Sequence, residues 1–181
     1  MNAKQNFMEN VTVLCDSREK RNNHIINFLD SYHIKHQKAT LELADYSFLI
    51  DGIDFSTEFS IERKGSIDEL FGNVTHDRAR FEREIANLKA NQGGAVLVLE
   101  RCPSLTALKS YRIDDETAVK QHRKIQNIGE VVYNTVMAWS LPNKYGLTVH
   151  YVENPADTGS VLLSLMYHEY QNYKACLSCK E

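Results

Sequence analysis

Short apolar runs alternate with amphipathic segments along most of the chain. Residues 11–15 (VTVLC), 46–50 (YSFLI) and 95–100 (AVLVLE) are rich in β-branched and aliphatic side chains, which predicts buried strands. We expect further strands over 55–62 (FSTEFSIE) and 147–152 (LTVHYV). The dipeptide Asp51-Gly52 favours a hairpin turn, so 46–50 and 55–62 should be neighbouring antiparallel strands.

Apolar residues at helical spacing lie between these runs. A helix is expected after Asn22 or Asn23, and Ser66 with Glu69 forms the capping box of another, which runs with a break near Gly72-Asn73 to Leu88. Further helices are expected over about 117–140 and 156–173, and a loop over 101–116. Alternating strands and helices predict a single α/β domain with a mixed sheet.

The composition fits an ordinary soluble globular protein. With 181 residues, 43% hydrophobic and 25% charged, the chain can bury a core. No apolar run approaches the roughly 18 residues of a membrane helix, and the N-terminus MNAKQNFMEN does not resemble a signal peptide. Four cysteines, with Cys15 and Cys102 far apart, favour a reducing compartment. The net charge of −3 does not indicate a nucleic-acid binder, but local charge governs binding more than the sum does.

Charged residues gather where the predicted strands begin and end. Residues two apart on a strand point to the same face, so Glu62 and Lys64 should project together. Asp45 begins the strand expected to pair with theirs. We therefore expect one edge of the sheet to hold five charged side chains: Asp16, Glu19, Asp45, Glu62 and Lys64.

Carboxylates gathered at one edge would repel one another unless a cation lay between them. Carboxylate oxygens and water are the ligands that Mg²⁺ and Mn²⁺ prefer, and a lysine beside such a metal can hold or deprotonate an attacking water. The set therefore fits metal-assisted phosphodiester hydrolysis. The alternative is that these residues are solvated strand ends whose ion pairs are weak.

The order of these residues resembles the nuclease domain of the XPF family, structure-specific DNA endonucleases of the PD-(D/E)xK superfamily. The family's motifs are DxRE, GDY and ERKxxxD, and the matching residues here are Asp16-Ser17-Arg18-Glu19, Ala44-Asp45-Tyr46, and Glu62-Arg63-Lys64 with Asp68. The motifs cover residues 11 to about 70. The helix to Leu88 and the strand 95–100 extend the resemblance to about 100, and the later elements are compatible with an extension to 173. Ala44 stands where the family has glycine, which should require only a slight backbone adjustment. The resemblance implies a restriction-endonuclease-like fold, a mixed central sheet flanked by helices.

The resemblance also implies a metal site for Mg²⁺ or Mn²⁺. Asp45 and Glu62 would be direct ligands, and the backbone carbonyl of Arg63 would complete the site. Asp16 would bind the metal directly or through water. Lys64 would position the attacking water or stabilise the charge of the transition state.

Other residues are expected to support the site or bind DNA. Asp68 would support the metal ligands from the following helix, or only interact favourably with that helix's dipole. Arg18 and Glu19 would contact phosphate and orient their neighbours. The expected DNA-binding residues are Arg18, Arg63, Arg78 and Arg80, and a second cationic cluster, Lys120, Arg123 and Lys124, is either a DNA contact or a solvated helical face.

The function that follows is a Mg²⁺- or Mn²⁺-dependent DNA endonuclease acting on branched, flapped or forked DNA in repair or recombination. We expect it inside the cell, in the cytoplasm or nucleoid of a prokaryote or phage, or in the nucleus of a eukaryote. One alternative is a non-catalytic DNA-binding or scaffold subunit with the same fold. Another is a different PD-(D/E)xK nuclease, such as a sequence-specific restriction enzyme.

The expected domain organisation is an N-terminal extension (1–10), a nuclease domain (11–175) and a C-terminal tail (176–181). Because nuclease domains of the family pair, we expect a homodimer or heterodimer and no membrane contact. Six apolar residues of the later helices are expected to lie in the core or on the dimer surface, and most of them in the core: Val132, Val136, Trp139, Leu162, Leu165 and Met166. Cys176 and Cys179 have metal-ligand spacing. Three interpretations are open: the two cysteines bind zinc, they form a redox-sensitive pair, or they have no role.

Overall fold

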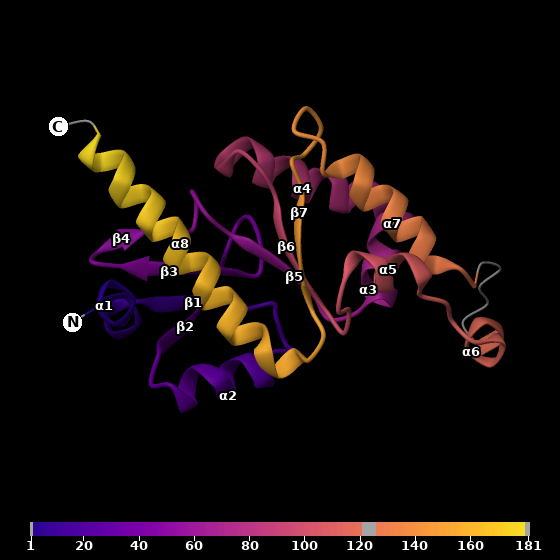
Figure 1. Cartoon of the computed structure of the whole chain (residues 1–181), viewed down its shortest axis with the longest axis horizontal. Helices are drawn as coiled ribbons and strands as arrows, with labels where there is room; N and C mark the ends of the chain where they lie inside the picture. Colours follow the sequence, from indigo (N-terminus) through magenta and orange to yellow (C-terminus); the bar gives the residue numbers. More distant parts are fainter. Residues whose placement is uncertain (1, 121–125, 180–181) are drawn as a thin grey trace. The chain divides into compact units, whose positions relative to one another are not determined.

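The computed structural model describes residues 2–120 and 126–179 and divides into two compact units. The first unit contains residues up to Ile61 and from Ala156 on, and the second is Glu62–Pro155. Figure 1 shows the elements in chain order: α1 (Ala3–Asn10), β1 (Thr12–Asp16), α2 (Asn23–Ser31), β2 (Lys35–Ala39), β3 (Tyr46–Ile50), β4 (Ile53–Asp54), β5 (Ile61–Lys64), α3 (Ile67–Thr75), α4 (Arg78–Gln92), β6 (Val96–Glu100), α5 (Leu105–Ser110), α6 (Asp115–Lys120), α7 (Ile128–Trp139), β7 (Thr148–Val152), a 3-10 turn (Pro155–Asp157) and α8 (Thr158–Ser178).

The strands of the first unit form a mixed sheet around β1. Strand β1 pairs in parallel with β2 on one side and antiparallel with β3 on the other. Strand β3 also pairs with β4 across the Asp51-Gly52 hairpin. Tyr46, the first residue of β3, pairs with Ile61 of β5. This register fixes which residue of each strand reaches the same edge of the sheet.

Aromatic side chains fill the core of the first unit. Phe48 of β3 stacks on Phe55 with the ring centroids 4.3 Å apart, and Phe7 of α1 packs edge-on against Phe48. Helix α8 lies alongside α2 and β3 (Figure 1). Gly159 allows this close approach, because a Cβ atom there would lie 2.4 Å from the ring of Phe28 on α2. Residues 3–10 are thus tied into the first unit through the buried Phe7.

The second unit packs helices around the parallel strands β6 and β7. The buried residues of β6 are aliphatic except for Glu100 at its end, and β6 pairs with β7 in the register Val98 to His150. Helices α4 and α7 meet at Phe81 and Trp139, whose ring centroids are 5.8 Å apart. Helix α4 ends at Gly93, whose φ of 79° is the left-handed conformation that glycine adopts without strain.

The expected fold class, α/β with a mixed sheet flanked by helices, is confirmed. The strands expected over 11–15, 46–50, 95–100 and 147–152 are present as β1, β3, β6 and β7. The long helix after Ser66 is present as α3 and α4, although the break follows Thr75 and not Gly72. The final helix begins at Thr158 and continues to Ser178, so Cys176 is helical.

Two segment predictions were wrong, and one strand was not predicted. The strand expected over 55–62 is confined to Ile61–Lys64, because Phe55 and Phe59 are joined by a helix-like turn in which Phe59 N donates to Phe55 O. The expected loop 101–116 contains α5, capped by Ser104, and the start of α6. Strand β2 was missed because its residues are polar and mostly exposed. Of the helix expected over 117–140, residues 121–125 lie outside the described residues.

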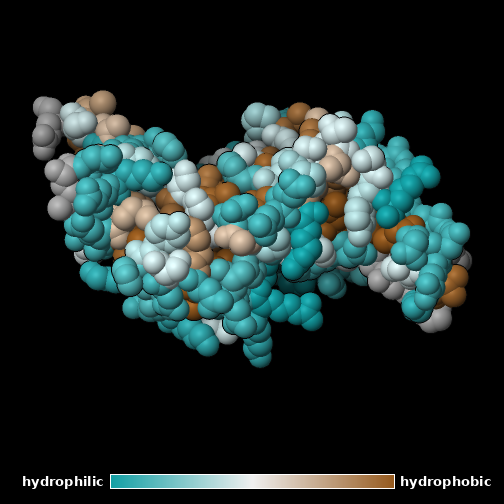
Figure 2. Space-filling model, turned by 60° about the horizontal axis from the view of Figure 1, so that its bottom comes forward, coloured by the Kyte–Doolittle hydropathy of each residue, from teal (hydrophilic) through white to brown (hydrophobic). Residues whose placement is uncertain are grey.

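Most large apolar side chains are buried. The strongly exposed ones among the described residues are Tyr32, Val119, Met137, Leu141 and Leu177. On the side of the molecule that Figure 2 shows, hydrophobic residues form only scattered patches between hydrophilic ones. In the described part of the chain, no helix has the length and apolar character needed to span a membrane.

Candidate active site

Three strand ends meet through backbone hydrogen bonds in the first unit. Asp16 N, at the end of β1, donates to Asp45 O over 2.8 Å, and Asp45 N donates to Ile61 O over 3.2 Å. Ile61 is the residue before Glu62 in the chain. The predicted convergence of these strand ends is therefore present in the backbone of Asp16, Asp45 and Ile61.

The buried carboxylate of Asp16 accepts four hydrogen bonds from N–H donors. Its oxygens accept from Arg18 N (2.7 Å), Arg18 Nε (2.8 Å), Arg18 Nη2 (2.7 Å) and Leu41 N (3.0 Å). A carboxylate offers about four acceptor positions, so this arrangement uses all of them. The hydrogen bonds from the Arg18 side chain hold the pKa of Asp16 below its ordinary value, against the opposing effect of burial. Asp16 thus holds Arg18, and it does not fit the role of a direct metal ligand in this arrangement.

Replacing Asp16 with asparagine should destabilise the protein by about 1.5–3 kcal/mol at neutral pH, because charged hydrogen bonds to Arg18 and Leu41 are lost. The folded-state pKa of Asp16 is lowered, so its contribution is present above the unfolded-state pKa and is lost as the pH falls through the folded value. Urea unfolding of both proteins should show a constant difference near pH 7 that shrinks below about pH 4. Equal stability at pH 7 would show that the Asp16–Arg18 arrangement does not stabilise the fold.

Glu19 and Arg18 lie just after β1. Glu19 N donates to Asp16 O, and the Glu19 carboxylate accepts from Arg21 N over 2.9 Å, so Glu19 shapes the local turn. The Arg18 side chain is 72% exposed although it is bound to Asp16 and to Leu41 O. Arg18 can therefore reach a phosphate in solvent while the buried carboxylate orients it.

Glu62 and Lys64 project to the same side of β5, as the two-residue spacing predicts. Lys64 Nζ lies 2.6 Å from Glu62 Oε1, and both side chains are about nine-tenths buried. The ammonium group also lies 3.9 Å from Glu69 Oε1 and 5.0 Å from the centre of the Phe81 ring. An ion pair with so little water around it is screened much less than a surface pair.

The Arg63 side chain points away from this pair and into the protein. Its Nη1 lies 2.7 Å from Glu100 Oε2 at the end of β6, and both side chains are almost fully buried. This geometry does not support the expected DNA contact of the Arg63 side chain. Glu100 was not among the predicted site residues, although a carboxylate at the end of the apolar run AVLVLE was a signal that a buried cation lay nearby.

The start of α3 is fixed by two hydrogen-bonded side chains. Ser66 Oγ accepts from Glu69 N over 3.2 Å, as the capping box predicts, but the Glu69 carboxylate accepts from Gly65 N and not from Ser66 N. Asp68, in the first turn, accepts a hydrogen bond of 2.7 Å from the Tyr111 hydroxyl. Asp68 therefore ties α3 to the segment after α5, in addition to its favourable place at the helix N-terminus.

The arginines at the start of α4 are about half exposed. Arg78 pairs with Glu82 at 3.0 Å and lies 5.5 Å from the centre of the Trp139 ring, and Arg80 pairs with Glu84 at 2.8 Å. Such exposed pairs are weak and can exchange for phosphate. In the second cationic cluster, Lys120 pairs with Glu116, whereas Arg123 and Lys124 lie outside the described residues.

The donor groups fit a divalent metal in kind but are not assembled as a ligand set. Within residues 2–120 and 126–179, no group of three or more His, Cys, Asp or Glu side chains is placed to hold a metal ion. The carboxylates of Asp45 and Glu62 are the hard oxygen ligands that suit Mg²⁺ or Mn²⁺. One Glu62 oxygen is bound by Lys64, so the lysine neutralises the charge that a metal would. Cys176 and Cys179 are exposed free thiols.

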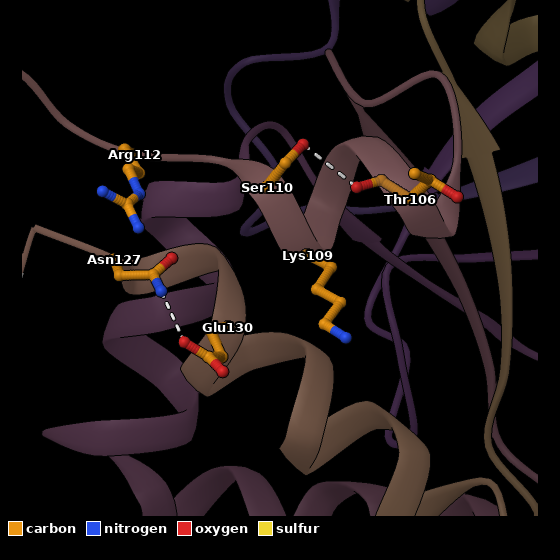
Figure 3. A pocket seen from close by; sticks show the side chains of 6 residues that line it. All are labelled: Thr106, Lys109, Ser110, Arg112, Asn127 and Glu130. Carbon is orange, nitrogen blue, oxygen red and sulfur yellow. Dashed lines mark hydrogen bonds between the residues drawn. The ribbon is translucent and has the colours of Figure 1, made fainter.

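An open pocket of about 330 Å³ lies elsewhere in the second unit (Figure 3). Its lining joins the C-terminal part of α5 to the start of α7: Thr106, Lys109, Ser110, Arg112, Asn127 and Glu130. Asn127 donates to Glu130, and Ser110 donates to the backbone of Thr106. None of the residues predicted for the active site lines this pocket.

The α/β fold with a buried glutamate–lysine pair on β5 is of the restriction-endonuclease-like class. The family model of the ERCC4 domain matches residues 15–165, and the chain belongs to this family, which implies a nuclease. Two solved structures of XPF from Aeropyrum pernix share the fold. One is 18% identical, with a TM-score of 0.58 over 87% of this chain and 61% of that chain. The other, described as a complex with DNA, is 16% identical, with a TM-score of 0.57 over 89% and 65%.

The match spans less than two thirds of each Aeropyrum pernix chain. At such low identity the likeness shows the fold alone. Among curated proteins, none matches this chain.

Proposed function

We propose that the protein is a Mg²⁺- or Mn²⁺-dependent endonuclease that hydrolyses phosphodiester bonds of branched, flapped or forked DNA in repair or recombination. The observation that carries the proposal is the nearly buried Glu62–Lys64 pair on β5, which lies within the span matched by the ERCC4 domain model. Because its substrate is cellular DNA, we place the enzyme inside the cell.

The proposed roles follow from the chemistry of each group. Asp45 and Glu62 would hold the metal with the Arg63 carbonyl, and Asp16 would act on the site through Arg18. A bound metal would neutralise charge on the phosphate and lower the pKa of a water. Lys64, a cation beside Glu62, would position the attacking water or stabilise the charge on an oxygen of the phosphate.

DNA would be held by exposed cations of both units. Arg18 is oriented by Asp16, and Arg78 and Arg80 are about half exposed on α4. Each pair between these α4 arginines and a glutamate can be replaced by a pair with a DNA phosphate, which adds affinity through the release of counterions.

A panel of duplex, flap, fork and four-way DNA substrates tests the proposal. We expect cleavage of the flap or fork that requires Mg²⁺ or Mn²⁺ and stops with a chelator. Binding to these substrates without cleavage in either metal would identify a non-catalytic subunit instead. Cleavage of duplex DNA at one fixed sequence would identify a restriction-type nuclease.

We propose a dimer in solution, as either a homodimer or a heterodimer. Of the apolar residues that could form core or dimer surface, Val132, Val136, Trp139, Leu162 and Met166 are buried, so they form core. The outer side of α7 and its end expose Met137 (45%) and Leu141 (54%), which are available for pairing. Light scattering should give about twice the monomer mass of 20.8 kDa for a homodimer, and a monomer mass at high concentration would exclude one.

A further inference from the structure

Arg101, the residue that follows β6, has an unusual backbone conformation. Its φ is 56°, in the left-handed region that bulky side chains rarely adopt. The other non-glycine residues with positive φ among those described are His33 and Asp51, and Asp51 sits in the β3–β4 hairpin, where such a conformation is common. Strained residues of this kind gather at functional sites, where the surrounding contacts hold them in place.

The strained backbone directs the Arg101 guanidinium to the end of β5. Its Nη1 donates to Gly65 O, one residue beyond Lys64. Both arginines lie close to Gly65, because a Cβ atom there would lie 3.2 Å from Arg63 Nη1, a tight contact, and 3.7 Å from Arg101 Nη1, an ordinary one. Two guanidinium groups therefore approach the backbone directly after the Glu62-Arg63-Lys64 segment.

The two arginines differ in their charge balance. Glu100 Oε2 lies 2.7 Å from Arg63 Nη1 but 3.8 Å from Arg101 Nη1, so the buried carboxylate neutralises Arg63 first. The Arg63 side chain is 5% exposed, whereas that of Arg101 is 60% exposed. Arg101 thus presents more than half of its side chain, which ends in the guanidinium group, to solvent. This group has five N–H donors in a planar fork that matches the oxygens of a phosphate.

We propose that Arg101 binds a backbone phosphate of the DNA strand that enters the site at Lys64. The inference rests on the proposed nuclease function and adds a residue that lies outside the DxRE, GDY and ERKxxxD motifs. The hydrogen bond to Gly65 fixes the guanidinium at a set distance from the end of β5, so the phosphate that it holds is placed relative to Lys64.

The test uses Arg101→Gly and Arg101→Asn, because glycine and asparagine both tolerate the left-handed backbone. Binding of fluorescent flap DNA is measured by anisotropy without divalent metal, over a range of salt concentrations. Both variants should bind more weakly, and the slope of log affinity against log salt should fall by about one, as expected for the loss of one phosphate contact. Their melting temperatures should stay within about 2 °C of the parent protein or rise, because backbone strain is relieved.

The matched control is Arg112→Asn, which removes an exposed arginine of the same unit that lines the open pocket and not the end of β5. An equal loss of affinity and slope in this control would mean that net charge, and not position, explains the effect. If the parent protein binds flap DNA and both Arg101 variants keep its affinity and salt slope, the inference is wrong and the nuclease proposal stands. A fall in melting temperature of more than about 5 °C in both variants would make Arg101 a structural anchor instead. A parent protein that binds none of the DNA substrates would overturn both proposals.

Discussion

Replacing Lys64 with alanine should reduce single-turnover cleavage of a flap substrate by about 10²–10⁴-fold, the range typical of a lost proton-transfer or water-positioning group. The same change leaves the nearly buried Glu62 carboxylate without the ammonium group now 2.6 Å away. Leaving a buried charge unpaired is costly, so the metal-free variant should also lose stability.

The metal response distinguishes this role from simple damage to the fold. Because Lys64 now competes for Glu62, Mn²⁺ should bind the Lys64→Ala variant at least as tightly as it binds the parent protein, and should restore much of its lost stability. Calorimetric titration and thermal melts with and without Mn²⁺ measure both effects. Lys109→Ala, an exposed lysine of the same unit, is the control and should behave like the parent. Cleavage by Lys64→Ala at the parental rate would remove Lys64 from the active site.

Asp45→Asn should abolish cleavage by a different route, with a loss of at least a hundredfold in rate and of about 10–100-fold in Mn²⁺ affinity, as for altered metal sites elsewhere. The substitution removes a charge but almost no volume. The backbone hydrogen bonds of Asp45 to Ile61 and Asp16 do not involve the side chain, so the fold should be retained.

Circular dichroism and melting temperature check the fold of Asp45→Asn, and Mn²⁺ titration with flap cleavage checks the site. Glu58→Gln, which neutralises an exposed carboxylate of the same unit, is the matched control and should bind metal and cleave normally. DNA binding should persist in Asp45→Asn, because the proposed phosphate contacts come from arginines. Unchanged Mn²⁺ affinity in this variant would contradict its role as a ligand.

Local patterns predicted β1, β3, β6 and β7 and the longer helices because each depends on neighbouring residues. The apolar runs of β1, β3 and β6 and the Ser66 cap of α3 are of this kind. Strand β5 was placed too early because Phe55 and Phe59 look like alternate strand positions. Their four-residue spacing was the signal of a turn that buries both rings.

The site was predicted as a set of residues but not as a set of interactions. The two-residue spacing was enough to place Glu62 and Lys64 on one side of β5. The pairing of Arg63 with Glu100 joins residues 37 positions apart. The hydrogen bond from Leu41 N to the Asp16 carboxylate joins residues 25 positions apart. Such long-range pairings depend on how the chain folds back on itself, which no local pattern encodes.

The first unit is made from the two ends of the described chain, and this has a consequence for the order of folding during synthesis. The segment up to Ile61 leaves the ribosome first, but α8, which packs beside β3 and α2, is made only after Glu62–Pro155. At about 5–20 residues per second this delay is on the order of ten seconds. During that time Phe28 lacks its contact with Gly159, and Phe7 and Phe55 lack their contacts with Tyr170. The nascent chain therefore exposes aromatic surface that α8 later covers, and we expect it to be a substrate for chaperones until α8 has been synthesised.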